Sequence, residues 1–420
     1  MKKYLYGILI FLISYTGNAQ TGTGGTDNKI ILGTIDNIDS KILKEKRQVW
    51  VYVPNSEQGG RVTAPTKYPV VYLLDGDGHF YSVVGMIQQL STVNGNTICP
   101  EMIVVGITNT DRTRDLTPTA VASGPYMDSN FVRTSGGGEQ FTRFMKEELM
   151  PYIDSAYPTL PYKVMIGHSL GGLTVINTLL KHKDLFNAYV AIDPSMWWDN
   201  QKLNKSAGTI LSQNDYKGKS LFLGIANTMN AGMDTGKVKL DTTMDSEHIR
   251  SIFALNNIFQ QSKSNGLAYS YKYYHDETHG SVPLISTYDA LKHIFKFYDL
   301  RLTMEDNMNF SRNTITKVEN HYKEVSKHFG FNYPVPELMI NQMGYMAMGS
   351  QKMEEAEYLF KMNIKNYPTS LNVYDSMGDF YASKGEKDKA IENYKKALAI
   401  KEFPVTRTKL DALIKQMPAK

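Results

Sequence analysis

The chain has almost no cysteine, little excess charge and no long apolar run. Cys99 is the single cysteine among 420 residues, so a disulfide framework and a cysteine-based zinc site are both excluded. The formal net charge is +4, which is too small for a nucleic-acid-binding surface. The apolar run from Tyr4 to Ile13 is shorter than the ~20 residues that a membrane-spanning helix needs. The composition is that of a globular protein, and the length predicts more than one domain.

The N-terminus has the pattern of a targeting segment. Lys2 and Lys3 precede the apolar run, and small residues follow at positions 17–19. A positive start, a short apolar segment and small residues at the cleavage site are typical of a secretory signal peptide. We therefore predict a signal peptide at residues 1–19 and export to the periplasm or the extracellular space, without stable membrane insertion. A buried N-terminal helix is the alternative interpretation.

Short apolar runs recur along residues 29–300, with helical patterns between them. Continuous runs of this kind are typical of parallel strands that are buried on both faces. The predicted strands are Val49–Val53, Val70–Leu74, Met102–Ile107, Val164–Ile166, Tyr189–Ile192, Leu221–Ile225 and Tyr269–Tyr274. The predicted helices are Gln140–Tyr152, Leu173–Lys181, Glu247–Gln261 and Ser286–Phe297. This alternation predicts an α/β domain whose sheet is flanked by helices.

Residues 317–420 show only helical patterns and contain a repeat of 34 residues. Glu337–Ser370 and Leu371–Pro404 carry matching residues at equal offsets: Gly344 and Gly378, Ala356 and Ala390, Phe360 and Tyr394. This period and these residue types resemble the tetratricopeptide repeat, a pair of antiparallel helices. We predict a small all-α domain here, able to bind a protein partner. An ordinary helical tail is the alternative.

The chemistry is concentrated in the segment Gly167–Gly172, which has the pattern G-x-S-x-G. The pattern alone is weak, but here a predicted strand precedes it and a predicted helix follows it. That context is typical of a nucleophile elbow, in which glycines permit a tight turn that exposes a serine hydroxyl. We therefore predict that Ser169 is a nucleophile. A strand-to-helix turn without catalysis is the alternative.

A serine nucleophile needs a base, and in such folds the order along the chain is serine, acid, histidine. His279 follows the last predicted strand and is the predicted base, with His275 as the weaker alternative. The acid is expected between the sixth strand and His279, on the loop before the next helix, where Asp234, Asp241, Asp245 and Glu247 lie. We favour Asp245 and then Glu247. Both could instead be helix caps, and a serine–histidine dyad is a further alternative.

An oxyanion needs two backbone N–H donors. The amide of Leu170, directly after the nucleophile, is the first predicted donor. The second is expected in a glycine-rich loop after an early strand, and we assign it to Asp77, with Gly76 as its neighbour. A cation site at Asp75 and Asp77 is the competing interpretation, although the spacing offers few further oxygen ligands.

Four blocks of the chain together resemble the putative-esterase family, which includes esterase D and the enterochelin-esterase-like and feruloyl-esterase-like hydrolases. The blocks are Leu73–Gly76, Asn109–Pro118, Gly167–Gly172 and His279–Pro283, in the family's order. The resemblance covers residues 30–300. It implies an α/β-hydrolase fold and carboxylic-ester cleavage, with Ser169 and His279 matching the nucleophile and the base.

Three further residues are candidates for substrate binding. Arg112 and Arg114 lie in a long loop that we expect near the pocket, where they could hold an acidic or phenolic acyl group. A salt network that holds the loop is the favoured alternative. Trp197 could contact an aromatic or sugar group, or pack at the domain edge.

These patterns predict an exported serine esterase that needs no cofactor or metal. The expected substrate is a small ester of the siderophore, phenolic or sugar-ester type. A non-catalytic scaffold that acts through its helical repeats and an acyltransferase with the same nucleophile are the alternatives.

Overall fold

The computed structural model describes residues 30–54, 66–123, 127–262, 265–308 and 310–416. The predicted signal peptide, residues 1–19, lies outside the described residues and stays a prediction. Within these ranges, no helix combines the length and the apolar character that crossing a bilayer requires.

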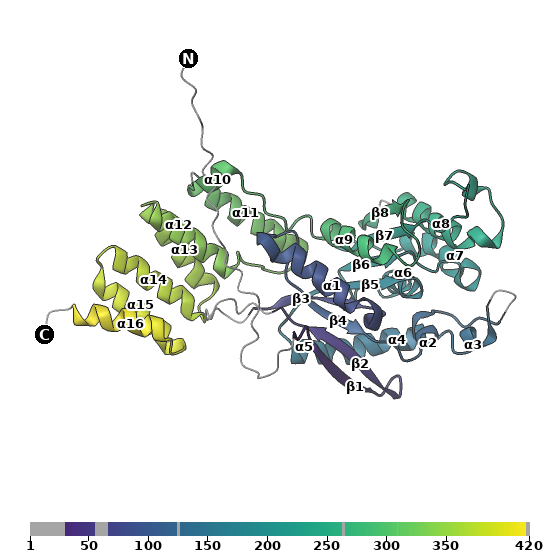
Figure 1. Ribbon diagram of the computed structural model, residues 1–420, viewed down its shortest axis with the longest axis horizontal. Coiled ribbons are helices and arrows are strands. Elements are labelled where there is room, and N and C mark those ends of the chain that lie inside the picture. The colour runs from purple at the N-terminus through teal and green to yellow at the C-terminus, as the bar shows by residue number, and fades with distance from the viewer. Residues whose placement is uncertain (1–29, 55–65, 124–126, 263–264, 309, 417–420) are drawn as a thin grey trace, which may run out of the picture.

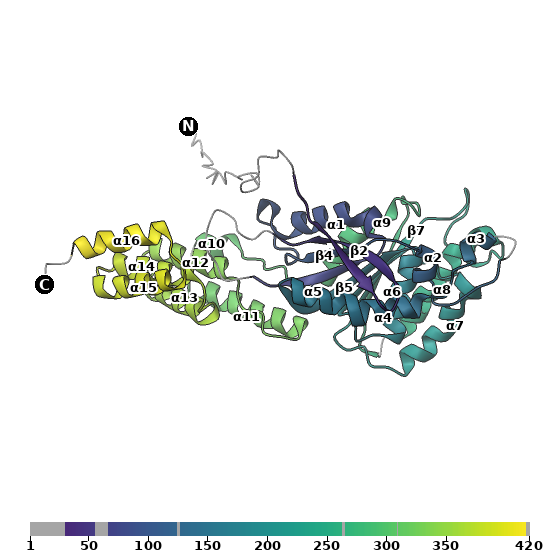
Figure 2. The same cartoon turned by 90° about the horizontal axis from the view of Figure 1, so that it is seen from below.

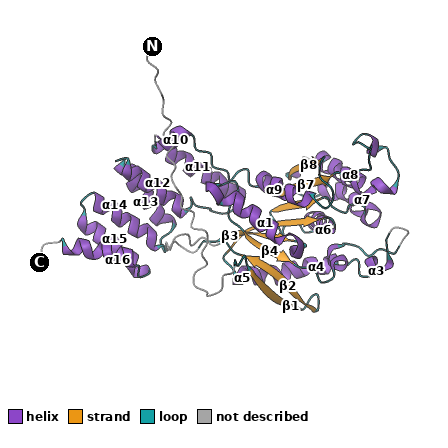
Figure 3. Ribbon diagram, in the orientation of Figure 1, coloured by secondary structure: helices purple, strands orange, loops and turns teal. Residues whose placement is uncertain are grey.

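One eight-stranded sheet forms the centre of the N-terminal part of the chain (Figure 1; Figure 3). Its strand order is β1-β2-β4-β3-β5-β6-β7-β8; β2 is antiparallel to both of its neighbours, and all other pairs are parallel. The strands are β1 (Thr34–Ser40), β2 (Glu45–Tyr52), β3 (Tyr68–Leu73), β4 (Ile103–Ile107), β5 (Thr159–His168), β6 (Ala188–Ile192), β7 (Ser220–Ala226) and β8 (Ala268–Tyr274). The predicted α/β sheet is confirmed.

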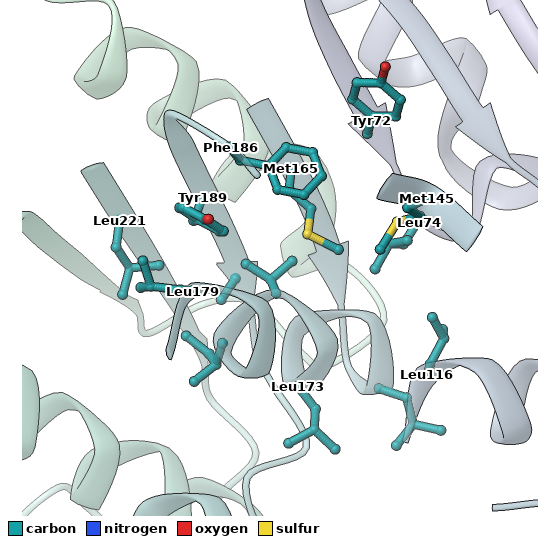
Figure 4. Packing of buried hydrophobic residues seen from close by; sticks show 14 of the residues in the cluster. Tyr72, Leu74, Leu116, Met145, Met165, Leu173, Leu179, Phe186, Tyr189 and Leu221 are labelled. Atoms are coloured by element: carbon teal, nitrogen blue, oxygen red, sulfur yellow. The ribbon is translucent and has the colours of Figure 1, made fainter. Parts of the chain in front are cut away.

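Both faces of the central strands β3, β4, β6 and β7 are buried, as their continuous apolar runs predict. Val70 and Tyr72 of β3 lie in one hydrophobic core, and Val71 and Leu73 lie in the other. Successive side chains of a strand point to opposite faces, so a strand covered on both sides must be apolar throughout. Figure 4 shows part of the first core, where side chains from β3, β5, β6 and α6 meet.

Helices cover both faces. The first core lies under α2 (Arg112–Leu116), α3 (Ser129–Val132), α4 (Gly138–Phe144), α5 (Met150–Ala156), α6 (Leu170–Lys181), α7 (Trp198–Ser212) and α8 (Glu247–Gln261). The second lies under α1 (Gly76–Ser91), α9 (Val282–Ile294) and α11 (Arg312–Phe329). The ends of β3, β5 and β6 that lead into α1, α6 and α7 share one edge of the sheet, where α/β folds place their sites.

The C-terminal region is all helical and lies at one end of the molecule (Figure 1; Figure 2). Its elements are α10 (Met304–Met308), α12 (Glu337–Gly349), α13 (Met353–Asn366), α14 (Leu371–Ser383), α15 (Lys387–Ile400) and α16 (Pro404–Lys415). A Cβ atom on Gly344 would lie 2.7 Å from the Phe360 ring, and one on Gly378 would lie 2.4 Å from the Tyr394 ring. The glycines therefore let each helix pair approach closely, as the repeat predicts. The tetratricopeptide identity itself stays a prediction.

An aromatic cluster joins the helical region to the sheet. The rings of Tyr162, on β5, and Phe329, on α11, are 4.9 Å apart, and the rings of Tyr162 and Phe295 are 5.8 Å apart. Tyr298 adds an edge contact to Tyr322 of α11. Buried residues of α11, α12 and α13 belong to the same hydrophobic core as those of α1 and α9. Helices α11, α12 and α13 are thus packed against the domain that contains the sheet.

Candidate active site

Ser169 occupies a strained turn between β5 and α6. Its backbone has φ 59° and ψ −117°, a conformation that residues other than glycine rarely adopt. A Cβ atom on Gly167 would lie 2.4 Å from the Gly171 carbonyl oxygen, and one on Gly172 would lie 2.9 Å from Pro194. Both positions therefore require glycine. This is the geometry of the predicted nucleophile elbow, with the serine at the N-terminus of a helix, where developing negative charge is stabilised.

His279 lies between Ser169 and a buried carboxylate. Its Nε2 atom is 3.2 Å from Ser169 Oγ, and its Nδ1 atom is 2.6 Å from Asp193 Oδ2. The structure thus brings together the predicted nucleophile and the predicted base. His275, the alternative base, is 80% exposed and contacts Asp276 instead. A nucleophile, a base that contacts it and an acid that orients the base form the arrangement of a catalytic triad.

Asp193 replaces the acid that we expected. It directly follows β6 and is fully buried. By contrast, Asp245 is exposed and accepts a hydrogen bond from Asn230, and Glu247 begins α8. In the described part of the chain, neither of these two carboxylates is a hydrogen-bond partner of His279. The expectation of Asp245 or Glu247 as the acid, and the alternative of a dyad, are therefore corrected.

Sheet register explains why Asp193 takes this position. β5 and β6 are parallel neighbours in which His168 pairs with Ile192, so the residues that follow them, Ser169 and Asp193, emerge side by side. The Ser169 amide donates to the Ile192 carbonyl at 3.0 Å. The order serine, acid, histidine also holds for Asp193. The sequence did carry one signal for this acid, because Asp193 is a carboxylate that directly follows an apolar predicted strand.

The carboxylate of Asp193 is held by three donors. Oδ1 accepts a hydrogen bond from the Ala226 amide at 2.9 Å, and Oδ2 accepts from His279 and from His248 Nε2, the latter at 2.8 Å. Burial raises the pKa of Asp193, but hydrogen bonds from His248 and His279 outweigh burial and hold that pKa well below its usual range. The group is therefore ionised whenever it orients His279. His248, which sequence reasoning did not identify, lies in the first turn of α8.

Ser195 places a second hydroxyl at the nucleophile. Its Oγ atom lies 3.2 Å from Ser169 Oγ, and its amide donates to the Ser169 carbonyl at 3.0 Å. With Ser169 donating to His279, Ser195 is positioned to donate to the nucleophilic oxygen. The segment after β6 thus supplies two groups to the site.

The two predicted oxyanion donors lie at the starts of adjacent helices. Leu170 begins α6, and Asp77 is in the first turn of α1. A Cβ atom on Gly171 would lie 3.4 Å from the Leu74 side chain, so the loop after β3 contacts the first turn of α6. The N-terminus of α6 at Ser169 favours an anion there. The individual donor assignments stay predictions.

Arg112 and Arg114 are engaged in salt bridges. Arg112 makes a bidentate pair with Asp75, at 2.6 and 3.0 Å. Burial raises the pKa of Asp75, but the Arg112 guanidinium has a larger opposing effect. The pKa of Asp75 is therefore below its ordinary value. Asn109 Nδ2 donates to both Asp75, at 2.8 Å, and Asp77, at 3.2 Å. These partners occupy the carboxylates that the competing cation site would require.

Arg114 belongs to a network away from Ser169. It donates to Glu45 at 2.6 Å and to Asp115 at 2.7 Å, and the hydrogen bond from Arg114 lowers the pKa of Glu45 to about 2. Arg47, which is 1% exposed, donates to both Glu45 and Asp115. This arrangement is the salt network that was the favoured alternative to substrate binding.

Replacing Arg47 with methionine is expected to lower the free energy of unfolding by about 3–5 kcal/mol, because buried Asp115 loses a charged partner. Urea unfolding followed by circular dichroism measures this change. As a control, Arg143→Met removes an exposed pair with Glu147 and is expected to leave the free energy of unfolding nearly unchanged, because solvent screens exposed ion pairs. Equal losses in the two variants would contradict the structural role of the network.

Trp197 is half-buried at the start of α7. Its ring lies 5.7 Å from that of Trp198, and it packs against the first core. Trp198 Nε1 donates to the Thr119 carbonyl, so the pair anchors part of the long loop. Packing is thus evident for Trp197, and a role in substrate binding stays a prediction.

His168, the last residue of β5, directly precedes Ser169 and is partly buried. It borders a small cavity of about 10 Å³ that His79 and Ser82 also line. Its Nε2 atom has no hydrogen-bond partner among the described residues. Burial, together with the charge of His279, lowers the pKa of His168 to about 4. The imidazole is therefore neutral at physiological pH.

This neutral histidine predicts a loss of stability in mild acid. Between pH 6.5 and about 4 the unfolded chain binds a proton that the folded chain excludes, so stability falls as the pH falls through that window. The loss reaches about 3 kcal/mol at the lower end. Urea titrations at pH 7 and pH 4.5 measure it. His168→Gln is expected to show a shallower decline, and an unchanged pH dependence would refute the assignment.

Known proteins resemble this chain in sequence. The sequence pattern of the family described as "Putative esterase" matches residues 40–279, more than half of the chain. Ferri-bacillibactin esterase BesA of Bacillus subtilis is 30% identical over 203 residues, which are 45% of this chain and 68% of that protein.

Solved structures resemble the fold. An IroE-like serine hydrolase from Shewanella oneidensis has a TM-score of 0.65 and 30% identity, over 79% of this chain and 98% of its own. An uncharacterised protein from Capnocytophaga ochracea, with a TM-score of 0.55 and 19% identity, covers 91% of this chain and 99% of its own, and shows likeness of fold alone. The α/β-hydrolase fold is thus confirmed. This chain belongs to the putative esterase family and is a carboxylic ester hydrolase.

Proposed function

We propose that the chain is an exported serine esterase that cleaves siderophore esters through an acyl-enzyme. The serine mechanism rests on two contacts of His279: its Nε2 atom lies 3.2 Å from Ser169 Oγ, and its Nδ1 atom lies 2.6 Å from Asp193 Oδ2. His279 Nε2 takes the proton of Ser169 while Ser169 Oγ attacks the ester carbonyl. Asp193 holds the other ring nitrogen and stabilises the imidazolium that forms.

The remaining steps use the same groups. The amides of Leu170 and Asp77 stabilise the tetrahedral oxyanion. His279 then gives its proton to the departing alcohol. A water molecule, deprotonated by His279, releases the acyl group from Ser169. No cofactor takes part in this sequence.

The substrate class is supported by relatives and by the predicted export. Similar proteins include the siderophore enterobactin esterase of Emericella nidulans and the siderophore triacetylfusarinine C esterase of Aspergillus fumigatus, at 27% and 25% identity. The signal-peptide pattern at residues 1–19 supports action outside the cytoplasm. Phenolic and sugar esters belong to the wider class of substrates that we propose. The helical region serves in this proposal as a packed extension that is able to bind a protein partner.

The test uses the mature chain from Gln20. We expect hydrolysis of ferri-bacillibactin and enterobactin with kcat/KM higher than for p-nitrophenyl butyrate, together with covalent labelling of Ser169 by a fluorophosphonate. Mass spectrometry of the labelled peptide identifies the residue. Labelling with hydrolysis of p-nitrophenyl butyrate alone would overturn the siderophore assignment. A folded chain that is neither labelled nor active on any of these esters would overturn the serine mechanism.

A further inference from the structure

Asp193 receives two histidines on a single carboxylate oxygen. His279 Nδ1 lies 2.6 Å and His248 Nε2 lies 2.8 Å from Oδ2. The two rings are perpendicular, with centroids 5.0 Å apart. A catalytic triad uses one histidine on its acid. His248 is therefore an additional group that the proposed mechanism does not need.

The three side chains form a donor set for a transition metal. One ligand atom from each of Asp193, His248 and His279 lies within 4.8 Å of the other two. Two imidazole nitrogens and a carboxylate oxygen are a combination that binds Zn²⁺ and similar divalent ions. The side chain of His279 is 41% exposed and that of His248 is 21% exposed, so an ion can approach from the histidine side.

The spacing requires only a small adjustment. Bonds of 2.0–2.2 Å around a tetrahedral ion separate ligand atoms by about 3.3 Å, compared with the 2.6 and 2.8 Å of the hydrogen bonds. Asp193 is fixed by the Ala226 amide at Oδ1. The ligand nitrogens of His248 and His279 lie within 4.8 Å of each other. The imidazoles, which are partly exposed, therefore make the movement.

We propose that Asp193, His248 and His279 form an inhibitory site for a divalent transition metal of the Zn²⁺ type. The inhibition rests on the proposed function, because it requires His279 to be the base. A metal at His279 Nδ1 takes the lone pair of that nitrogen, so the ring proton moves to Nε2. His248 likewise carries its proton on Nδ1 while Nε2 binds the metal. No proton is lost overall.

This change of tautomer explains how the metal blocks the reaction. The free chain has a lone pair on His279 Nε2 that faces Ser169. In the metal-bound chain the same nitrogen carries a hydrogen and can only donate. It therefore cannot take the proton of Ser169, and the nucleophile is not activated. Loss of the general base lowers kcat by about 100-fold or more.

Metal binding is tested without catalysis. Co²⁺ is added to the mature Ser169→Ala chain, which retains all three ligands, and the visible absorption of bound cobalt is titrated. Zn²⁺ binding to the same chain is measured by calorimetry. We expect one site, and His248→Gln in this background is expected to weaken it at least about tenfold. His275→Gln removes an exposed histidine that precedes His279 in the chain and is expected to leave the affinity unchanged.

Two further measurements complete the test. Zn²⁺ is expected to inhibit ester hydrolysis by the Ser169 chain, with reversal by EDTA. A crystal soaked in Zn²⁺ is expected to show zinc anomalous density about 2.0–2.2 Å from the three ligand atoms, a result that does not depend on any variant folding. Three results would overturn the proposal. They are a metal affinity that His248→Gln does not change, zinc density at another place, and zinc that binds an active chain without inhibiting it. A zinc site at these residues in a chain that cleaves no ester would support the site and refute the esterase.

Discussion

Replacing Asp193 with asparagine is expected to lower kcat for ester hydrolysis by about 10⁴-fold, with a smaller change in KM. The amide removes the charge that stabilises the His279 imidazolium, and its NH₂ group favours the wrong tautomer of the ring. The variant is nearly isosteric, and the Ala226 amide can still donate to its carbonyl oxygen. Steady-state kinetics with p-nitrophenyl butyrate measure the effect, with circular dichroism as the check on folding.

Asp245→Asn is the matched control for this prediction. Asp245 is exposed and accepts a hydrogen bond from Asn230, and among the described residues it is not a hydrogen-bond partner of His279. We expect kcat to change by less than about twofold, as for surface substitutions away from a site. The opposite result, a large loss in Asp245→Asn and none in Asp193→Asn, would contradict the prediction. The acid would then be Asp245, and the contact between Asp193 and His279 would have no role in catalysis.

Replacing Ser169 with alanine is expected to lower kcat by about 10⁶-fold, the largest effect of any single change in the chain. The acyl-enzyme cannot form without the hydroxyl, and the oxyanion donors alone leave a weak residual catalysis. Alanine at this position keeps the strained backbone, with φ 59°, so we expect folding and thermal stability close to those of the parent chain. Single-turnover hydrolysis at high enzyme concentration quantifies the residual rate.

Ser195→Ala serves as the control for loss of a hydroxyl at the site. Its oxygen lies 3.2 Å from Ser169 Oγ, whereas the hydrogen-bond partners of His279 in the described part of the chain are Ser169 and Asp193. We expect a decrease in kcat of about tenfold, the value of one neutral hydrogen bond. If Ser195→Ala abolished fluorophosphonate labelling while Ser169→Ala retained it, the nucleophile would be Ser195.

Most of the fold could be predicted from local patterns. All seven predicted strands occur in the sheet, and Glu247–Gln261 has the predicted bounds as α8. Strand β1 was missed because its sequence, TIDNIDS, is mostly polar and its residues are largely exposed. An edge strand that pairs antiparallel with β2 is held by backbone hydrogen bonds, so it carries little hydrophobic signal. The helix after the elbow begins at Leu170, three residues before the predicted start.

The sequence by itself determined the α/β sheet and the elbow, and it predicted the two residues, Ser169 and His279, that the structure brings into contact. Each of these depends on residues that are contiguous along the chain: apolar runs for strands, and G-x-S-x-G for the turn at Ser169. Apolar burial and glycine conformation act over a few residues, so their signals are local.

Only the tertiary structure decided which carboxylate serves His279 and which partners the arginines take. Asp193 lies beside Ser169 because β6 pairs with β5 in a register that brings their ends together. His248 reaches the same carboxylate from α8, 55 residues away along the chain. Arg112 is neutralised by Asp75, from the end of a different strand. Electrostatic and hydrogen-bond partners are chosen by distance in space, and that distance is set by strand order and register, which the spacing of residues along the chain does not encode.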